Sequence, residues 1–400
     1  TDNRDVEIIE EVQNIDGFES IKKMELEEAI AKGLYNTIGQ DLVDDYISQV
    51  KALSVNKDII EKIGQDIKIV YTPLHGAGNK PVRRVLKELG FENVIVVPEQ
   101  ELPDPNFSTV KYPNPEERES LMLAIELAQE VDADVVIGTD PDCDRVGVVV
   151  RDSNGEYVVL TGNQVGVLLV DYYLEALKSK DRLPENGIII KTIVTSDLGG
   201  EIAKYYGVES VDTLTGFKFI CSKMKEYEES GKGKFIFGYE ESYGYLAGDF
   251  VRDKDGVIAT MLVCEMVAYY KSRDMTLYDA LEDIWSRFGY YRDELKPIVL
   301  KGKEGMEKIT DIMDGLRNNP PLEIAGVKVK AVEDYLLDEE LNLPKSNVLK
   351  YKLVDGSWFA IRPSGTEPKL KIYFSAHGED VQLVDTRMEA LVEDVLDRIR

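Results

Sequence analysis

Short apolar runs alternate with amphipathic segments of helical length from residue 68 to residue 272, and this alternation restricts the possible folds more than any other feature. Because strands separated by helices usually pair in parallel, with helices on both faces of the sheet, the alternation predicts α/β domains. The first half predicts, in order, strand 68–73, helix 81–90, strand 94–97, helix 114–131 with Asn114 as its cap, and strand 134–138.

The same alternation restarts after Thr161-Gly162-Asn163 and predicts a second α/β domain of similar size. Its expected elements are helix 163–179, strand 187–194, helix 197–207, strand 208–213, helix 217–229, strand 234–242 and helix 255–272.

The last hundred residues follow a different pattern. Alternating strands within 322–334, 347–365 and 369–376 precede one helix over 379–400. Strands in a run, with helices to one side, are typical of an α+β domain. The predicted fold class is therefore α/β, with two successive α/β domains that have mainly parallel sheets, followed by a smaller α+β domain at the C-terminus.

The charge balance and the cysteines exclude several classes of protein. The chain has 75 acidic and 48 basic side chains and a net charge of -27, which argues against nucleic acid or an anionic membrane as a partner. Three separated cysteines form no disulfide framework or zinc motif and favour a reducing, cytoplasmic location. No apolar run approaches the roughly 18 residues of a membrane span. The sequence does not predict an oligomeric state.

The segment GTDPDCDR (138–145) follows an apolar strand and presents Asp140, Asp142 and Asp144 at alternating positions. Ligands of open parallel sheets bind beyond the carboxyl ends of the strands, and three carboxylates there suit a hard cation such as Mg²⁺. The adjacent Arg145 can hold a phosphate oxygen. An EF-hand is disfavoured, because no glycine follows Asp144 and no glutamate closes a twelve-residue loop.

Two later loops also follow apolar strands. In GYEESYG (238–244), Glu240 and Ser242 are suited to bind sugar hydroxyls, although an ordinary polar turn is the favoured interpretation of this loop taken alone. The segment RPSGTEPKLK (362–371) offers a guanidinium, two hydroxyl groups and free backbone N–H groups within five residues, which is typical of an anion-binding turn. Its candidate phosphate-binding residues are Arg362, Ser364, Gly365 and Thr366.

Other loops carry weaker signals. Lys218 in TLTGFK (213–218) lies near the start of a predicted helix and is a further anion candidate, while Arg252 and Lys254 add positive charge. In TPLHGAGNK (72–80), the glycines Gly76 and Gly78 would let the backbone approach a ligand, whereas a packing role is expected for His75.

Taken together and in this order, these loops resemble those of the α-D-phosphohexomutase family of phosphoglucomutases and phosphomannomutases. The likeness covers residues from about 40 to 400. TPLHGAGNK resembles the start of the family's second domain, GTDPDCDR its metal loop, TLTGFK and GYEESYG its third-domain loops, and RPSGTEP its phosphate loop. The stretch GYEESYGYLAGDFVRDKDG resembles the bacterial phosphoglucomutase branch, which also includes phosphopentomutase-like relatives.

The resemblance implies a phosphotransferring isomerase that uses Mg²⁺ and a phosphoserine. The serine would give its phosphoryl group to the sugar phosphate, the bisphosphate would reorient, and the other phosphate would return to the serine. The implied metal ligands are Asp140, Asp142 and Asp144, and the implied catalytic residues are Arg145 and Lys254. The implied substrate-binding residues are Thr215, Gly216, Lys218, Glu240, Ser242, Arg252, Arg362, Ser364, Gly365 and Thr366.

The chain departs from the family pattern in two ways. It contains no T-A-S-H-N-P serine loop, so the resemblance implies an inactive fragment that binds Mg²⁺ weakly. Gly244 and Phe250 stand where some relatives have a histidine, so the general acid/base stays open: Lys254 is one candidate, and the missing domain is another source. The implied division is a linker after a missing phosphoserine domain (1–42), then metal-binding (43–161), sugar-binding (162–290) and phosphate-binding (291–400) domains.

Several functions remain open at this point. Interconversion of glucose 1-phosphate and glucose 6-phosphate is the leading hypothesis, with phosphomannomutase and phosphopentomutase as alternatives, because Glu240 and Ser242 do not discriminate the sugar's position 2. A non-catalytic sugar-phosphate binder is also compatible with the missing serine. A phosphatase with Asp140 as nucleophile fits poorly, since Asp144-Arg145 departs from the D-x-D-x-[TV] pattern.

Overall fold

The computed structural model describes residues 4–300, 302–364 and 368–399, and the chain divides into two units after Tyr46. The first unit is helical, and apolar side chains such as Ile8 and Val12 are exposed on it. Its elements are α1 (Arg4–Gln13), the 3-10 turn η1 (Phe18–Ser20), α2 (Leu26–Ala31) and the start of α3 (Gln40–Leu53).

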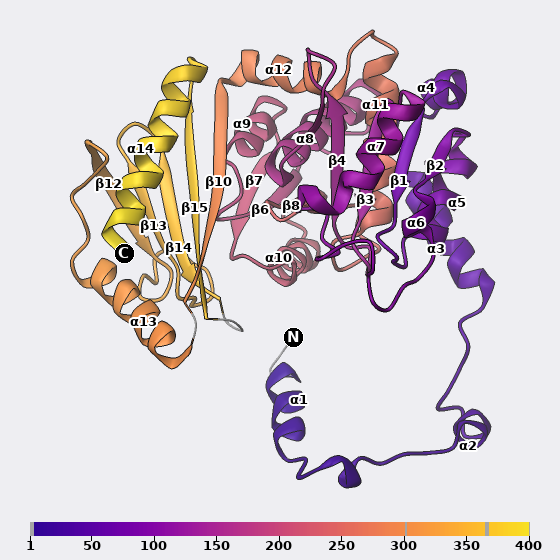
Figure 1. Cartoon of the computed structure of the whole chain (residues 1–400), viewed down its shortest axis with the longest axis horizontal. Coiled ribbons are helices and arrows are strands. Elements are labelled where there is room, and N and C mark those ends of the chain that lie inside the picture. The colour runs from indigo at the N-terminus through magenta and orange to yellow at the C-terminus, as the bar shows by residue number, and fades with distance from the viewer. Residues whose placement is uncertain (1–3, 301, 365–367, 400) are drawn as a thin grey trace. The chain divides into compact units, whose positions relative to one another are not determined.

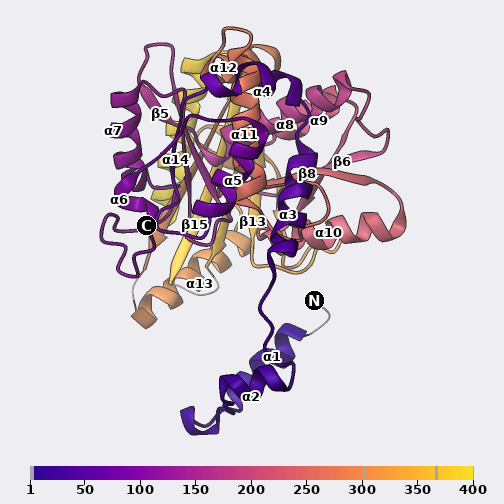
Figure 2. The same cartoon turned by 90° about the vertical axis from the view of Figure 1, so that its right-hand side faces the viewer.

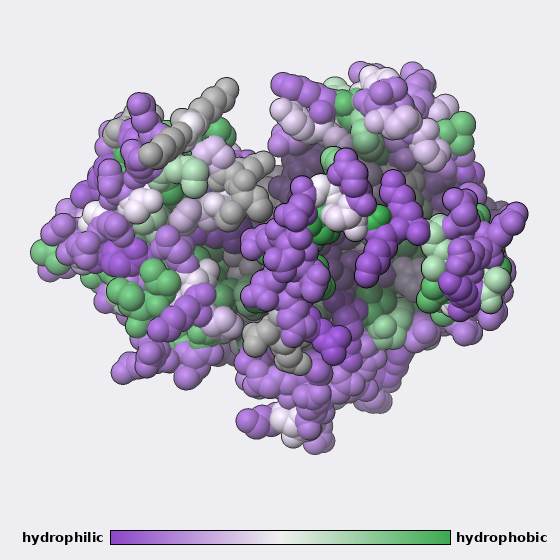
Figure 3. All heavy atoms as spheres, turned by 90° about the horizontal axis from the view of Figure 1, so that it is seen from below, coloured by the Kyte–Doolittle hydropathy of each residue, from purple (hydrophilic) through white to green (hydrophobic). Residues whose placement is uncertain are grey.

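The second unit begins at Ile47 and contains three sheets that follow one another along the chain (Figure 1). Before the first sheet come the end of α3, α4 (Lys57–Ile63) and the turn η2 (Gly64–Asp66). Among the described residues, no helix combines the length and apolar character that a membrane crossing requires. Polar side chains cover most of the face seen in Figure 3, which agrees with the large net charge.

The first sheet has the order β2-β1-β3-β4-β5, in which β2, β1 and β3 are parallel and the last two strands antiparallel. Val70, Val136 and Val149 lie in register on one face and pack against α7. Two helices that follow the second sheet in the chain, α11 and α12, contact β3 and β4. The elements are β1 (Ile69–Thr72), α5 (Asn79–Leu89), β2 (Val94–Val96), α6 (Pro98–Glu101), η3 (Arg118–Leu121), α7 (Met122–Val131), β3 (Val135–Thr139), β4 (Val146–Arg151) and β5 (Tyr157–Val159).

The second sheet has the order β7-β6-β8-β9, with β6 parallel to β7 and β8, and β9 antiparallel to β8. Glycines let helices approach it closely: a Cβ on Gly166 or Gly199 would overlap the ring of Tyr239. The elements are α8 (Gly162–Ser179), β6 (Gly187–Thr192), α9 (Leu198–Tyr205), β7 (Glu209–Thr213), α10 (Phe217–Ser230), β8 (Lys234–Glu240), β9 (Gly244–Ala247), α11 (Gly256–Lys271) and α12 (Leu277–Phe288).

The third sheet has the order β10-β15-β14-β13-β12-β11, and its neighbouring strands are antiparallel. Apolar residues of one face, including Phe359 and Phe374, form a core with α13 and α14. The elements are β10 (Tyr290–Val299), α13 (Gly302–Asn318), β11 (Glu323–Ile324), β12 (Val327–Asp334), β13 (Leu349–Leu353), β14 (Trp358–Pro363), β15 (Lys369–Gly378) and α14 (Val381–Ile399).

This architecture confirms the predicted fold class, and it corrects some elements. Antiparallel strands extend both α/β sheets, because the chain turns back directly after β3 and β8 rather than crossing over through a helix. The helix expected over 114–131 begins with a 3-10 turn at Arg118. Asn114 does not cap it; its side chain accepts the N–H of Glu116 in the preceding turn.

Candidate functional site

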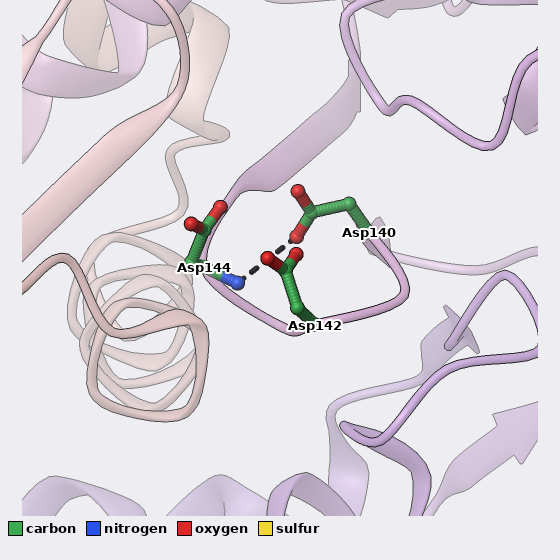
Figure 4. A group of neighbouring side chains, drawn as sticks. All are labelled: Asp140, Asp142 and Asp144. Carbon is green, nitrogen blue, oxygen red and sulfur yellow. Dashed lines mark hydrogen bonds between the residues drawn. The ribbon is translucent and has the colours of Figure 1, made fainter. Parts of the chain in front are cut away.

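The loop after β3 brings three carboxylates together (Figure 4). One potential ligand atom each of Asp140, Asp142 and Asp144 lies within 4.8 Å of the others. The loop is shaped by Asp140, whose Oδ1 accepts the backbone N–H groups of Asp144 (2.9 Å) and Arg145 (2.8 Å). The carboxylates therefore converge because the first of them folds the backbone that carries the third.

The charges of this loop suit a divalent cation. Burial, together with the neighbouring charges of Asp144 and Asp142, raises the pKa of Asp140 to about 7, although the N–H of Arg145 opposes this shift. A raised pKa means that the ionised carboxylate is disfavoured by its surroundings. A hard cation ligated by oxygen atoms would relieve that repulsion, so the three side chains fit such an ion.

The glycine loop before α5 lies against the metal loop and not against free space. A Cβ on Gly76 would be 2.4 Å from the Cα of Pro141, and one on Gly78 would be 2.8 Å from the Sγ of Cys143. These glycines therefore admit the metal loop, where the sequence suggested a direct approach to a ligand. His75 is buried, as expected for a packing role, and its ring nitrogens contact Leu102 O and Thr109 Oγ1 at 2.8 Å.

The loop of three aspartates is also joined to the loops that follow β8 and β9 of the second sheet. Lys254 Nζ lies 2.6 Å from Asp144 Oδ2, Gly256 donates its N–H to the carbonyl of Cys143 (2.8 Å), and Val146 donates to the carbonyl of Tyr243 (3.0 Å). Burial alone would lower the pKa of Lys254, but its contact with Asp144 raises it. Lys254 therefore places a positive charge beside the carboxylates from more than a hundred residues away.

Arg145 follows the three aspartates, and its guanidinium lies beside acidic groups. Its Nη1 pairs with Glu116 Oε1, and its Nε lies 3.7 Å from Asp140 Oδ2 and 3.9 Å from Asp144 Oδ1. The sequence did not single out Glu116, which precedes η3 in a segment that was expected to be helical. Only the folded chain shows that it orients Arg145.

The sugar-binding candidates lie at the end of β8. Glu240 is buried, and its Oε1 accepts the N–H of Gly216 at 2.7 Å. Gly216 has a φ of 118°, which an L side chain rarely adopts, so a glycine is favoured in this turn. Burial and the charge of Glu241 raise the pKa of Glu240 to about 7. Ser242 is partly exposed at the edge of a cavity.

Glu241 stands between the two sugar candidates, and the sequence analysis did not assign it a role. Its Oε2 accepts hydroxyl hydrogen bonds from Thr192 (3.1 Å) and Thr195 (3.2 Å). Its backbone touches the start of α8, because a Cβ on Gly162 would be 2.0 Å from the carbonyl oxygen of Glu241. The doubled glutamate in GYEES was the available signal: the Glu240 carboxylate holds the turn at Gly216, and the Glu241 carboxylate holds the loop to Thr192 and Thr195.

The phosphate candidates lie at the end of β14. Arg362 hydrogen-bonds through Nη1 to Thr215 Oγ1, and within the described residues its buried Nε has no hydrogen-bond partner. Lys371 is opposite Arg362 on β15; burial and the charge of Arg362 lower its pKa. Ser364 donates its N–H to the carbonyl of Lys369 (2.7 Å). Gly365 and Thr366 lie outside the described residues.

Two further candidates, Lys218 and Arg252, have partners outside the predicted set of site residues. Lys218 is exposed on the first turn of α10, with Nζ 5.1 Å from the centre of the Phe219 ring. Arg252 is exposed and pairs with Glu228 on α10 at 2.5 Å. Their substrate-binding roles stay predictions.

A cavity of about 200 Å³ lies beside the sugar-binding candidates, between the start of α8 and strands β10 and β15. Asn163, Glu241 and Ser242 line one side of it, while Asp293 and Lys371 line the other. The second and third sheets therefore both supply polar groups to the same space. Of the predicted site residues, Ser242 lines this cavity, together with Glu116 and Lys371, which contact or face the predicted residues Arg145 and Arg362.

Three family models match the chain in succession. They are described as phosphoglucomutase/phosphomannomutase alpha/beta/alpha domain II over residues 44–155, alpha/beta/alpha domain III over 161–288, and the C-terminal domain over 313–392.

Similar proteins carry related names. A phosphoglucomutase of Staphylococcus haemolyticus (strain JCSC1435) is 41% identical over 369 residues, which cover 90% of this chain and 65% of the relative. One of Staphylococcus aureus (strain MRSA252) is 39% identical over 363 residues, covering 88% of this chain and 64% of that protein. The chain thus spans slightly less than two thirds of the length of these relatives.

Solved structures share the fold. The open form of parafusin, a phosphoglucomutase of Paramecium, has a TM-score of 0.66 at 18% identity. The aligned part covers 89% of this chain and 62% of the parafusin chain. A phosphoglucomutase/phosphomannomutase family protein of Burkholderia thailandensis has a TM-score of 0.60 at 17% identity. The aligned part covers 89% of this chain and 64% of that protein's chain.

Proposed function

Because the chain belongs to the phosphoglucomutase/phosphomannomutase family, we propose that it supplies the metal, sugar and phosphate sites of a hexose-phosphate mutase. The proposed reaction interconverts glucose 1-phosphate and glucose 6-phosphate through a bisphosphate. The observation that carries this proposal is the convergence of residues far apart in the sequence. Lys254 pairs with Asp144, Glu240 accepts the N–H of Gly216, and Arg362 contacts the adjacent Thr215. Gly244, the strand partner of Glu240, lies against the Lys254 side chain and joins the two groups.

In this proposal, each group has a defined task. Bound Mg²⁺, held by Asp140, Asp142 and Asp144, would offset negative charge on the transferring phosphoryl group. Arg145 and Lys254 add positive charge next to these carboxylates. Glu240 and Ser242 orient the sugar through its hydroxyl groups. Arg362, Ser364, Gly365 and Thr366 hold the phosphate that does not react. The remaining substrate-binding residues are Thr215, Gly216, Lys218 and Arg252.

The phosphoryl donor in this proposal is a phosphoserine, and the 400 residues contain no T-A-S-H-N-P string that would supply it. Turnover therefore requires a serine from outside this sequence. We also propose the division into a linker (1–42) and metal-binding (43–161), sugar-binding (162–290) and phosphate-binding (291–400) domains.

Phosphomannomutase and phosphopentomutase activity are the alternatives within the same chemistry. Rates of the serine-bearing protein on glucose, mannose and ribose 1-phosphates would separate them. A glucose rate far below the ribose rate would eliminate the glucose assignment. A non-catalytic sugar-phosphate binder would bind these compounds without turnover even when the serine loop is present.

Arg362→Gln is expected to weaken the binding of glucose 1-phosphate by about 10–100-fold. The variant removes a charged donor whose Nε has no partner in the described chain, and a hydrogen bond to a charged group contributes about 1.5–3 kcal/mol. Calorimetric titration of the 400-residue chain with glucose 1-phosphate measures the change.

Arg398→Gln is the matched control, because Arg398 lies on α14 and pairs with Asp394. Its affinity for glucose 1-phosphate should equal that of the unchanged chain. Equal affinities of the Arg362 and Arg398 variants would remove the phosphate role of Arg362.

Glu240→Gln is expected to stabilise the chain at pH 8, by an amount on the order of 2 kcal/mol, and to leave stability unchanged below pH 4.5. Burial and Glu241 raise the pKa of Glu240 from 4.5 to about 7. Because the folded state holds this proton more tightly than the unfolded state, stability falls as pH rises from about 4.5 to 7. Glutamine carries no charge and keeps an acceptor for the N–H of Gly216.

Thermal unfolding in the presence of a chelator, at pH 4.5 and pH 8, tests this pH dependence. The exposed Glu282 on α12 provides the control Glu282→Gln. A Glu240 variant that is no more stable than this control at pH 8 would show that the buried carboxylate carries no such penalty.

A further inference from the structure

The loop that follows β6, residues 193–197, contacts both the loop that carries the sugar-binding candidates and the third sheet. Its residues Ile193, Val194, Thr195 and Ser196 are buried. Lys191 Nζ donates to the carbonyl of Thr195 at 3.3 Å, and Asn163 Oδ1 accepts the N–H of Ser196 at 3.1 Å. The 193–197 loop is therefore held from the sheet and from the start of α8, which makes it a rigid support.

On one side, this loop holds the sugar-binding loop. Thr195 Oγ1 donates to Glu241 Oε2 at 3.2 Å, and Thr192 at the end of β6 donates to the same oxygen at 3.1 Å. Glu241 lies between the two residues proposed to bind sugar hydroxyls. The 193–197 loop and the end of β6 therefore fix the position of Glu240 and Ser242 through Glu241.

On the other side, the same loop holds the third sheet. Lys350 Nζ donates to the carbonyl of Ile193 at 2.7 Å, and Trp358 Nε1 donates to Asp197 Oδ2 at 2.9 Å. The Lys350 ammonium also lies 3.9 Å from the centre of a Trp358 ring. Asp197 is fixed in turn, because its Oδ1 pairs with the buried Lys191 at 3.2 Å.

The strand geometry connects this contact to the phosphate site. Trp358, Ala360 and Arg362 alternate along β14 and share one face, and Lys350 is opposite Ala360 on β13. Trp358 at the start of β14 meets Asp197, while Arg362 at its end meets Thr215. The placement of Arg362 therefore follows from where the start of the same strand is held.

We propose that Lys350 and Trp358, docked on the 193–197 loop, are positioning residues that set the spacing between the sugar-binding loop and Arg362. This proposal rests on the proposed function and deepens it. A hexose phosphate must satisfy both ends of the site at once, so its affinity depends on their spacing. Inorganic phosphate needs only the Arg362 end, and its affinity is independent of that spacing.

Trp358→Phe tests the proposal, because it keeps an aromatic ring and removes the N–H that Asp197 accepts. We expect the dissociation constant of glucose 1-phosphate to rise at least fivefold and that of inorganic phosphate to change less than twofold. The preference for glucose 1-phosphate over ribose 1-phosphate should fall as well. Calorimetric titration of the full chain with each of the three compounds gives these ratios.

Lys350→Met is the second variant, since it keeps an apolar stem and removes the ammonium, with both its bond to the Ile193 carbonyl and its contact with the Trp358 ring; the same pattern of losses is expected. Trp285→Phe is the matched control, because Trp285 lies on α12 and packs on Tyr278 and Tyr290. It should leave all three dissociation constants unchanged.

Two results would overturn the positioning role. Equal weakening for glucose 1-phosphate and inorganic phosphate would indicate general damage, and unchanged ratios in both variants would show that the spacing is set elsewhere. Failure of the proposed function looks different: the unchanged chain itself would then bind glucose 1-phosphate no more tightly than inorganic phosphate, and the positioning role would fall with it.

Discussion

Replacing Asp142 by asparagine is expected to weaken Mg²⁺ binding to this chain by about 10–100-fold, a range that applies even to residues behind the first ligands of metal sites. Asp142 is exposed, and no hydrogen bond to its side chain is seen in the described part of the chain. The backbone of the loop is shaped instead by Asp140. The variant therefore removes one ligand charge and leaves the fold of the loop intact.

Calorimetry with Mg²⁺, supported by electron paramagnetic resonance of bound Mn²⁺, measures this loss. Asp274→Asn gives the same change of charge at an exposed turn and should bind Mg²⁺ like the unchanged chain. Binding to the unchanged chain is itself expected to be weak, since the family resemblance implies that a phosphoserine oxygen completes the ligand set. Equal Mg²⁺ affinities of both variants would rule out this loop as the metal site.

Replacing Glu265 by alanine is expected to lower the free energy of unfolding of the second unit by about 3–5 kcal/mol. This carboxylate of α11 is fully buried. It accepts hydrogen bonds from Ser54 Oγ, from the N–H groups of Val55 (2.9 Å) and Asn56 (3.1 Å), and from Tyr172 OH (2.6 Å). Alanine leaves these donors unsatisfied and opens a cavity between α11, α8 and the α3–α4 link.

Urea unfolding followed by far-ultraviolet circular dichroism gives this free energy. Glu126→Ala on the exposed face of α7 is the control for losing a helical glutamate, and it should change stability by less than about 0.5 kcal/mol. Glu265→Gln should fall between the two, because an amide still accepts but carries no charge. A loss below about 1 kcal/mol for Glu265→Ala would contradict the structural role of this carboxylate.

Glu265 also matters for the site. Figure 2 shows α11 within the second unit, and α11 contacts α5, α4 and β9. Its first residue, Gly256, donates to the carbonyl of Cys143 in the metal loop. One helix is thus held by a buried carboxylate along its length and by the metal loop at its start.

Two kinds of local pattern in the sequence predicted structure correctly: the spacing of polar residues after a strand and the period of the apolar residues. Asp140, Asp142 and Asp144 could be predicted to converge, because they alternate directly after a buried strand. The α/β order of the first two sheets followed from the period of the apolar residues in the same way. The antiparallel strands β4, β5 and β9 were missed, since a short strand that turns straight back has no helix to mark it.

Contacts between side chains that are distant in the sequence could not be predicted from local sequence patterns. Glu240 and Glu241 are identical neighbouring residues with different partners. Glu240 accepts the N–H of Gly216, whereas Glu241 accepts the hydroxyl groups of Thr192 and Thr195. Gly76 and Gly78 suggested room for a ligand, but Pro141 and Cys143 fill that space.

The sequence by itself determined the fold class and the loop of three carboxylates, because periodicity and spacing depend only on residues close together in the chain. The family followed from the resemblance of the loops to those of known phosphohexomutases. Only the tertiary structure decided which charges lie beside that loop. Lys254 reaches Asp144 because the part of the chain that carries the second sheet packs on the first. Glu116 reaches Arg145 because the segment before η3 folds back onto the loop after β3. The free energy of such contacts depends on burial and distance, and these are set only when the whole chain has folded.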